Sequence, residues 1–281
     1  MALGILAIGG YLPKARLQRT DIANANAWFN PALKGLANGE RTMANWDEDS
    51  VTMAVEAGRD CLTGIDRNIV VGIYMASTSF PFQDRQNAGI VADALNLSTR
   101  IQTLDISSSQ RAGSSALLTA LLSVHSAEGP ILVSASEKRR ARAASPLELT
   151  TGDGAAAVLV GEGEPIAHYI GGHTEAVDFV DHYRGEGEAF DYNWEERWVR
   201  DEGYMKIAPN AINNLLDKVG VSAQDIDTFC FPVAMRRVAS GLARKIGIAE
   251  ESVADNLQSS CGETGSAHAL VLLVHALEQA K

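Results

Sequence analysis

Short apolar runs alternate along this chain with segments of helical period, and this alternation restricts the fold more than any other feature of the sequence. The runs are rich in Ile, Val and Leu and almost uninterrupted, which is typical of strands in a sheet covered on both faces. In the first half they are Leu3–Gly10, Ile69–Ser77, Ile101–Ile106, Ile131–Ala135 and Ala155–Val160. The helical segments are Ser50–Leu62, Arg85–Leu95 and Ala112–His125. The pattern predicts an α/β fold.

The second half repeats this order, which indicates two related halves divided near Gly161–Pro165. Its predicted strands are Ile166–Gly171, Ile226–Phe231 and Val253–Leu257, and its predicted helices are Tyr204–Val219, Met235–Ile246 and Ser266–Gln279. We therefore predict an N-terminal half at 1–165 and a C-terminal half at 166–281. Between the first strand and first helix of the second half, Val177–Tyr204 carries two tryptophans and many charges. We interpret it as a structured insertion, the alternative being a solvated loop.

The first half follows its third helix with two more strands, whereas the second half stops after its own third helix. Either the duplication is imperfect or two strands are missing. A sheet without them keeps an open edge, and open edges invite association. We expect the chain to be a truncated product or to be completed by strands from a partner, with an apolar patch beside Ala269–Leu277.

Composition and charge narrow the classes of partner. The 281 residues carry a net charge of −11, which argues against general nucleic-acid binding and against an anionic membrane surface. The three cysteines form no C-x-x-C pair, so we expect no zinc site, and their odd number fits a reducing cytoplasm. The longest apolar runs are far short of a membrane span, and the opening residues lack the basic region of a signal peptide.

The segment LDISSSQRAGSSAL, Leu104–Leu117, has the layout of a strand-to-helix elbow. Enzymes place nucleophiles at such elbows, because a helix N-terminus stabilises an anion. The tip of this elbow reads Ser109-Gln110-Arg111, without a cysteine. A glutamine amide is not a nucleophile, and Ser109 would need a base.

A second small-residue turn, SSCGETGSAHAL, opens the last helix and brings Cys261, Glu263 and His268 within ten residues. These could supply a nucleophile, an acid and a base; the alternative is a capping turn with Cys261 packed as a small hydrophobe. The turn TTGDGAAAVLVG contains Asp153, for which a structural use is favoured over a catalytic one.

A basic run stands out in this acidic chain. The segment FCFPVAMRRVASGLARKIG carries Arg236, Arg237 and Arg244, which could hold a phosphate group or a nucleotide tail. The alternative is a solvated helix face.

Taken together, these segments resemble the thiolase superfamily and, within it, the hydroxymethylglutaryl-CoA synthase branch. The resemblance is carried, in the order of the family, by NWDEDSVTMAVEAGRDCL, YMASTS, LDISSSQRAGSSAL, ILVSASEKRRARA, TTGDGAAAVLVG, VDFVDHYRG, FCFPVAMRRVASGLARKIG and CGETGSAHALVLLVHALE. It implies a duplicated five-layer α/β/α/β/α fold, here with a second half lacking its last two strands. It also implies a dimer and an enzyme that forms or breaks C–C bonds in acyl-CoA thioesters, with no bound cofactor or metal.

The resemblance also implies a catalytic cysteine, histidine and glutamate, and the chain departs from all three. The cysteine position falls on Gln110, the histidine position on Pro232 and the glutamate position on Ser79. Glu263 stands where the ketoacyl synthases of the superfamily have an asparagine. A condensation through an acyl-cysteine is therefore not expected at this elbow.

Three functions compete. The first is a cytoplasmic acyltransferase or lyase acting on acyl-CoA with a rebuilt site, using Glu263, His268 and either Cys261 or Ser109, while Gln110 and the helix N-terminus stabilise an enolate or alkoxide. The second is a non-catalytic subunit pairing with itself, with another thiolase-like protein or with a zinc-ribbon/OB-fold protein. The third is a carrier of CoA esters. Convergence of Glu263 and His268 on a pocket under Gln110 would favour the enzyme, which we prefer.

Overall fold

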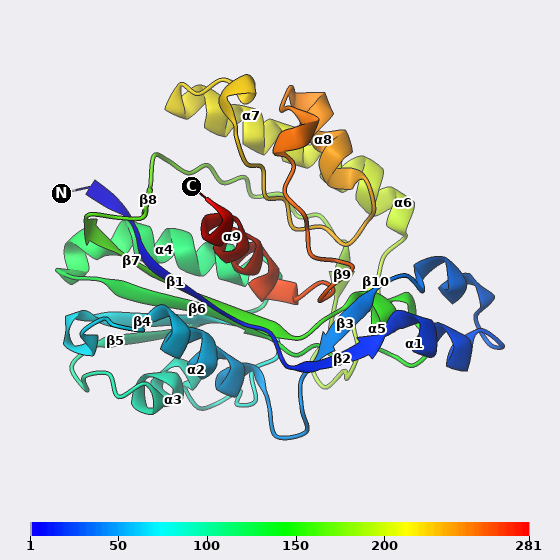
Figure 1. Ribbon diagram of the computed structural model, residues 1–281, viewed down its shortest axis with the longest axis horizontal. Coiled ribbons are helices and arrows are strands. Elements are labelled where there is room, and N and C mark those ends of the chain that lie inside the picture. Colours follow the sequence, from blue (N-terminus) through cyan, green and yellow to red (C-terminus); the bar gives the residue numbers. More distant parts are fainter. Residues whose placement is uncertain (1, 281) are drawn as a thin grey trace. The chain divides into compact units, whose positions relative to one another are not determined.

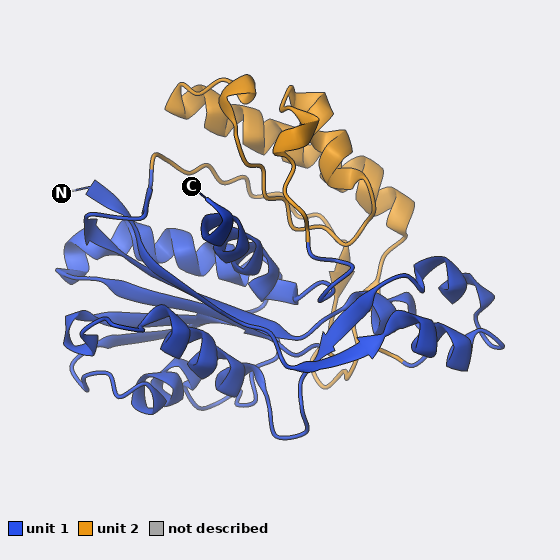
Figure 2. Cartoon of the chain, in the orientation of Figure 1, with its two compact units in different colours: residues 1–139, 143–169, 257–281 blue, residues 140–142, 170–256 orange. Residues whose placement is uncertain are grey.

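The computed structural model describes residues 2–280, which divide into two compact units. Unit 1 comprises residues 1–139, 143–169 and 257–281, and unit 2 comprises residues 140–142 and 170–256 (Figure 2). The C-terminal segment therefore belongs to the same unit as the N-terminal half. The division into related halves at residue 165 stays a prediction about the sequence.

Unit 1 is built on a six-stranded mixed sheet with the order β5-β4-β6-β7-β1-β8. The strands are β1 (Ala2–Tyr11), β4 (Gly72–Ala76), β5 (Gln102–Ile106), β6 (Ile131–Glu137), β7 (Gly154–Gly163) and β8 (Ala167–His168). β4 runs parallel to β5 and β6, while β7 runs antiparallel to both β6 and β1. Every residue of β4 and β6 is buried, as continuous apolar strands require. The five strands predicted for the first half are confirmed.

Helices cover both faces of this sheet (Figure 1). α2 (Ser50–Cys61) and α3 (Asn87–Ala94) bury one apolar cluster with the sheet, and α4 (Ala112–Ala127) and α9 (His268–Gln279) bury the other. The other α-helices and strands of unit 1 are α1 (Arg19–Asn26), α5 (Pro146–Thr150) and the hairpin of β2 (Ala15–Gln18) and β3 (Glu40–Met43). Because α9 lies in this core, residues 269–277 are all buried or half-buried. The helix itself is therefore covered, and the apolar patch expected beside it stays a prediction.

The described residues of unit 2 contain three α-helices, α6 (Glu196–Trp198), α7 (Ile207–Val219) and α8 (Val238–Ile246), and a two-stranded ladder of β9 (His182–Tyr183) and β10 (Tyr192–Asn193). The helices predicted there are confirmed. The strands predicted at 226–231 and 253–257 form only one bridge, between Phe229 and Val253. The strand predicted at 166–171 is short and lies at the edge of the first sheet. Among the described residues, the predicted strands of the second half therefore do not form a sheet of their own.

The predicted insertion at 177–204 is partly ordered into β9, β10 and α6. Phe179 stacks on Trp198 with ring centroids 6.1 Å apart, although Trp198 remains 47% exposed. These rings border a groove of about 320 Å³. Its lining residues are Glu175, Val177, Phe179, Trp198, Glu202, Lys206, Ile207 and Asn210.

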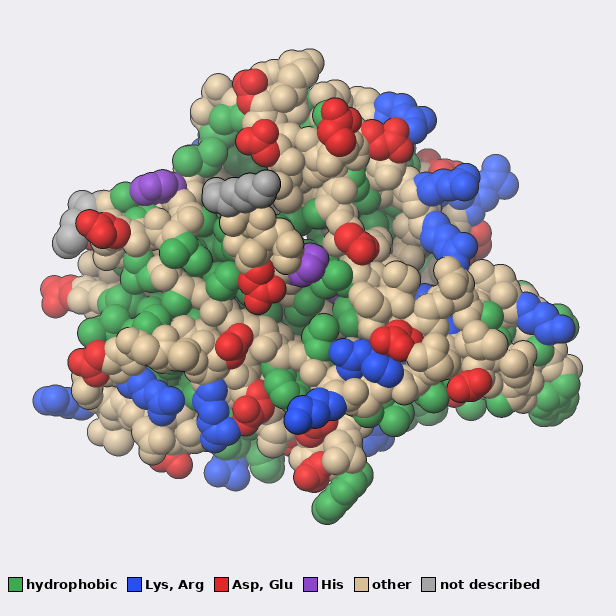
Figure 3. All heavy atoms as spheres, in the orientation of Figure 1, with side chains coloured by type: hydrophobic (Ala, Val, Ile, Leu, Met, Phe, Trp, Pro, Cys, Tyr) green, Lys and Arg blue, Asp and Glu red, His purple; other side chains and the backbone are tan. Residues whose placement is uncertain are grey.

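Acidic and basic side chains are interspersed on the face of the molecule seen in Figure 3. Within residues 2–280, no helix combines the length and apolar character needed to cross a bilayer. No group of three or more His, Cys, Asp or Glu side chains suited to a metal ion occurs in the same range.

Candidate functional site

The elbow predicted at 104–117 is present. β5 ends at Ile106, α4 begins at Ala112, and the residues between them form a tight turn. Ser108 has a φ of 70°, a left-handed conformation that costs a non-glycine residue about 1–3 kcal/mol. The Arg111 N–H donates to Ser109 Oγ at 3.1 Å. Ser109 is exposed and Gln110 is half-buried, so the two candidate residues differ in access to solvent.

Gln110 lies beside the loop that follows β4. Its Nε2 group donates to Thr78 Oγ1 at 3.4 Å, whereas Gln110 Oε1 is buried without a hydrogen-bond partner in the described chain. Thr78 Oγ1 in turn donates its hydrogen to a carboxylate. The threonine oxygen can therefore only accept from Gln110, and this fixes which way round the amide lies.

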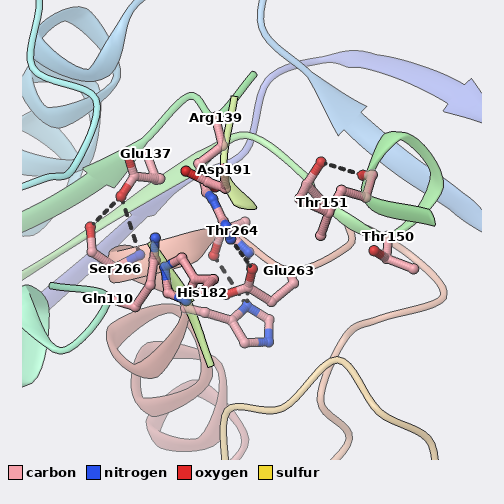
Figure 4. A network of polar contacts seen from close by, with 12 residues as sticks. Gln110, Glu137, Arg139, Thr150, Thr151, His182, Asp191, Glu263, Thr264 and Ser266 are labelled. Carbon is pink, nitrogen blue, oxygen red and sulfur yellow. Dashed lines mark hydrogen bonds and ion pairs between the residues drawn. The ribbon is translucent and has the colours of Figure 1, made fainter. Parts of the chain in front are cut away.

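That carboxylate belongs to Glu137, the last residue of β6, which has no exposed surface. Glu137 Oε2 accepts hydrogen bonds from Thr78 N at 3.0 Å, Thr78 Oγ1 at 3.0 Å, Ser266 N at 3.3 Å and Ser266 Oγ at 2.6 Å. Ser77 Oγ donates to the other oxygen at 3.3 Å. Figure 4 shows the carboxylate facing Ser266. Burying a charge is costly unless it is hydrogen-bonded, and these five donors meet that requirement.

Gly265 makes room for this network. A Cβ atom at this position would lie 2.5 Å from Glu137 Cγ and 3.0 Å from both Arg139 Cδ and Gln110 Oε1. Gly265 also has a φ of 57°, which an L side chain rarely adopts. The small residue of the GETGS turn thus allows three polar side chains to meet.

Glu263 forms an ion pair with Arg139, whose Nη1 lies 3.0 Å from Glu263 Oε2 (Figure 4). Their side chains are only 19% and 6% exposed, so the pair is largely withdrawn from water. The backbone of Glu263 is bonded to Thr150 and Gly152 of the GDG turn. This turn therefore has a structural use: it holds the backbone of Glu263 beside the site.

His268 and Cys261 face the interior. Thr264 N donates to His268 Nδ1 at 3.3 Å, so this nitrogen carries no hydrogen. His268 is 0% exposed and Cys261 is 1% exposed. Both side chains are therefore withdrawn from solvent. The convergence of Glu263 and His268 on a pocket under Gln110, and the catalytic roles of these residues, stay predictions.

Asp153, the acidic residue of the GDG turn, is buried beside Arg41. Burial raises the pKa of Asp153, while the hydrogen bond from Ala44 N and the charge of Arg41 oppose that shift. Burial also lowers the pKa of Arg41. Thr42, next to Arg41 in the chain, donates its hydroxyl hydrogen to the Asp153 carbonyl oxygen and its N–H to the Cys261 carbonyl oxygen. This cluster fastens β3 to both turns of the site.

The three arginines predicted to bind phosphate are in unit 2. Arg236 and Arg237 are exposed, and Arg237 has a left-handed φ of 64° just before α8 begins. Arg244 lies 3.9 Å from Glu250, with both side chains more than 70% exposed. An exposed ion pair of this kind contributes little stability, so Glu250 holds Arg244 only weakly. All three guanidinium groups are exposed and therefore accessible to an anion.

The resemblance implies a catalytic glutamate at Ser79 and a catalytic histidine at Pro232, and the structure shows the surroundings of both positions. Ser79 Oγ accepts from Lys138 N at 2.8 Å, next to Glu137. Pro232 is exposed in unit 2.

The sequence interpretation missed Glu137, Thr78, Ser266 and Arg139. A charged residue directly after the buried run ILVSAS was the signal for Glu137, because the carboxyl ends of strands are where α/β proteins place ligands.

Known proteins resemble the chain over its whole length. Residues 216–281 match the family described as 3-oxoacyl-[acyl-carrier-protein (ACP)] synthase III C terminal. The hydroxymethylglutaryl-CoA synthase of Caldivirga maquilingensis is 29% identical, with 100% of this chain and 82% of that protein covered. That of Methanosphaera stadtmanae is also 29% identical, with 99% and 82% covered.

Solved structures show the same fold. OleA from Xanthomonas campestris superposes with a TM-score of 0.88 at 19% identity, covering 99% of this chain and 89% of the other. The 3-oxoacyl-(acyl carrier protein) synthase III FabH from Pseudomonas aeruginosa superposes with a TM-score of 0.84 at 20% identity, covering 99% and 90%.

The predicted α/β class with a thiolase-like fold is therefore confirmed. Within that class, the sequence of this chain resembles the hydroxymethylglutaryl-CoA synthases, as expected from its motifs.

Proposed function

We propose that this protein binds an acyl-CoA thioester and forms or cleaves a C–C bond of its acyl group without an acyl-cysteine intermediate. The observation that carries the proposal is Gln110 at the elbow, where the resemblance places a nucleophilic cysteine. Around Gln110, the side chains of Thr78, Glu137 and Ser266 form a hydrogen-bonded network. A site that had only lost its nucleophile would have no need of a buried, five-fold hydrogen-bonded carboxylate.

The names of the relatives support the substrate class. The curated relatives are hydroxymethylglutaryl-CoA synthases, and a lauroyl-CoA is bound in one of the structurally similar OleA proteins. CoA carries phosphate groups, and Arg236, Arg237 and Arg244 are exposed guanidinium groups that suit them. No cofactor is needed for this chemistry, because the thioester itself stabilises the carbanion.

The acyl-cysteine route is disfavoured by the remaining thiols. Cys61 lies under the sheet, where burial raises the pKa of its thiol to about 12. Burial also raises the pKa of Cys230. Cys261 is buried, with its Sγ 3.3 Å from the Leu257 carbonyl oxygen. A reactive cysteine instead needs a thiolate with access to solvent.

Mass spectrometry after incubation with acetyl-CoA tests the proposal, with binding measured in parallel by calorimetry. We expect binding without a covalent acetyl group on any residue. The matched control is Gln110→Cys, which restores a thiol at a helix N-terminus and should acquire the acetyl group. An adduct on Ser109 or Cys261 of the unaltered protein, or no binding of any acyl-CoA, would contradict the proposal.

A non-catalytic subunit is the second candidate. Two observations favour it: His268 has no exposed surface, and Glu263 is engaged by Arg139. Such a subunit would pair with itself, with a thiolase-like protein or with a zinc-ribbon/OB-fold protein in the cytoplasm. Binding of acyl-CoA without turnover of any acyl-CoA tried, alone or with such a partner, would support it.

A further inference from the structure

The groove bordered by Phe179 and Trp198 lies within unit 2, and none of the residues proposed to bind or act on acyl-CoA lines it. Ile207 and Asn210 contribute to it from one face of α7, because residues three apart lie on the same side of a helix. Gly203 gives Phe179 its place, since a Cβ atom there would lie 2.8 Å from Phe179 Cε1. Unit 2 therefore builds a groove of its own.

The charged side chains that line the groove are two carboxylates and one ammonium group. Lys206 Nζ lies 2.6 Å from Glu202 Oε2, so the charge of the lysine is already balanced. Glu175 Oε1 accepts from Asn214 Nδ2 at 2.8 Å and lies 3.3 Å from His173 Nε2, and the Glu175 side chain is 26% exposed. The groove thus has a carboxylate held in position at its edge, which suits a cationic ligand.

The chain around the groove is strongly acidic. Residues 177–204 contain nine aspartates and glutamates but only three arginines. Each arginine forms an ion pair with an aspartate of the same segment: Arg184 with Asp191, and both Arg197 and Arg200 with Asp201. The segment keeps a large excess of negative charge, which attracts a ligand with several positive charges and repels nucleic acid and anionic lipid.

Apolar and aromatic surface accompanies this charge. Trp198 is 47% exposed and Val177 is 52% exposed, and both line the groove. The Trp198 ring is stacked on Phe179, which restrains the orientation of the indole. An indole face attracts ammonium and guanidinium groups, and the aliphatic stem of a lysine or arginine packs on apolar side chains.

We propose that the groove is a docking site for a basic segment of a partner protein, in which arginine or lysine side chains alternate with apolar ones. Charge complementarity carries the proposal. One small cation would be matched by Glu175 alone, whereas the acidic excess of residues 177–204 extends beyond the groove and matches a segment with several charges. An arginine suits both parts of the groove, because its planar head stacks on aromatic rings and donates to carboxylates.

The test is fluorescence anisotropy of the full chain with a short labelled peptide of alternating arginine and leucine. We expect saturable binding that weakens as salt rises, and no binding of the same peptide with glutamate in place of arginine. Trp198→Ala should weaken binding by about three- to thirty-fold, the contribution of a cation on an indole face. Trp194→Ala is the matched control, because Trp194 is also 47% exposed but does not line the groove.

Charge variants separate the groove from the general acidity of the chain. Lys206→Gln leaves Glu202 without its lysine, so the peptide should bind about two- to five-fold more tightly. Lys34→Gln in unit 1 changes the net charge equally and should have no such effect. Glu175→Gln should weaken binding by about ten-fold or more, because hydrogen bonds to charged groups are strong. The exposed Glu251 supplies the control Glu251→Gln.

Thermal melts establish that each variant is folded. If the peptide does not bind, or if Trp198→Ala and Glu175→Gln bind it as the unaltered protein does, the proposal is overturned. Displacement of the peptide by an equal concentration of hexylamine would overturn it in favour of a small cation. Self-association that Trp198→Ala abolishes and Trp194→Ala preserves would instead assign the groove to a second copy. Acyl-CoA takes no part in these measurements, so the proposed function can fail without affecting them.

Discussion

At the scale of single residues, Gly265 is a position where the site has no room for added volume. Gly265→Ala would place a methyl group 2.5 Å from Glu137 Cγ and force an L residue to keep a φ of 57°. We expect a loss of about 1–3 kcal/mol in the free energy of unfolding, measured by urea titration. Gly35→Ala is the control, because nothing lies within 4 Å of its added Cβ. Equal stability of the two variants would show that the turn can shift without cost.

The residues of the site were predictable from sequence only where chain neighbours define them. Gln110 follows from the elbow, because its strand, turn and helix are contiguous. Glu137 was missed because the run SASEKRR reads as a charged, solvated segment, and its burial depends on donors at Ser77, Thr78 and Ser266. Pairings across 129 residues of chain leave no local pattern. The same limit explains why the Arg139–Glu263 ion pair was not anticipated.

At the scale of elements, the start of α2 is set by its own sequence. Asp49 accepts from Thr52 N at 2.8 Å, and Thr52 Oγ1 accepts from Asp49 N at 2.7 Å, a reciprocal capping box. Asp49→Ala should cost about 1 kcal/mol in the free energy of unfolding. The exposed Asp47→Ala, two residues earlier, is the control for loss of charge. An equal effect of the two variants in chemical denaturation would mean that charge and not capping matters.

Helices were predicted better than strands in the second half, and the reason is physical. α7, α8 and α9 satisfy their backbone groups internally, so their periodicity suffices to identify them. A strand needs a neighbour, and the apolar run at 226–231 meets only Val253 through a single bridge. Residues 167–168 have a neighbour in β1 and therefore join the first sheet.

At the scale of the whole molecule, the alternation of the first half was sufficient to predict unit 1, because each strand pairs with another from the same region of chain. The sequence did not indicate that residues 257–281 complete this unit. α9 is strongly apolar because it packs against α4 and β7, and the same pattern was interpreted as an unfilled surface. Apolar character shows that a helix is covered but does not identify what covers it.

The edge of the unit 1 sheet leads to a prediction about assembly. Among the described residues, β5 pairs only with β4, so one side of β5 has no strand beside it. Leu104 in the middle of β5 is 39% exposed. An exposed edge strand with an apolar side chain is a template for pairing with another chain. We expect two copies of this protein to associate along β5.

Light scattering coupled to gel filtration measures this association. The unaltered protein should have twice the 30.0 kDa mass of the chain. Leu104→Lys should shift it to the monomer, because a lysine on an edge strand opposes strand pairing. Ile69→Lys is the control, since Ile69 is 43% exposed and lies outside the strands. A monomeric unaltered protein would exclude the association. A dimer that survives Leu104→Lys would place the association elsewhere, because a dimer joined at β5 cannot tolerate a buried, unpaired charge at its centre.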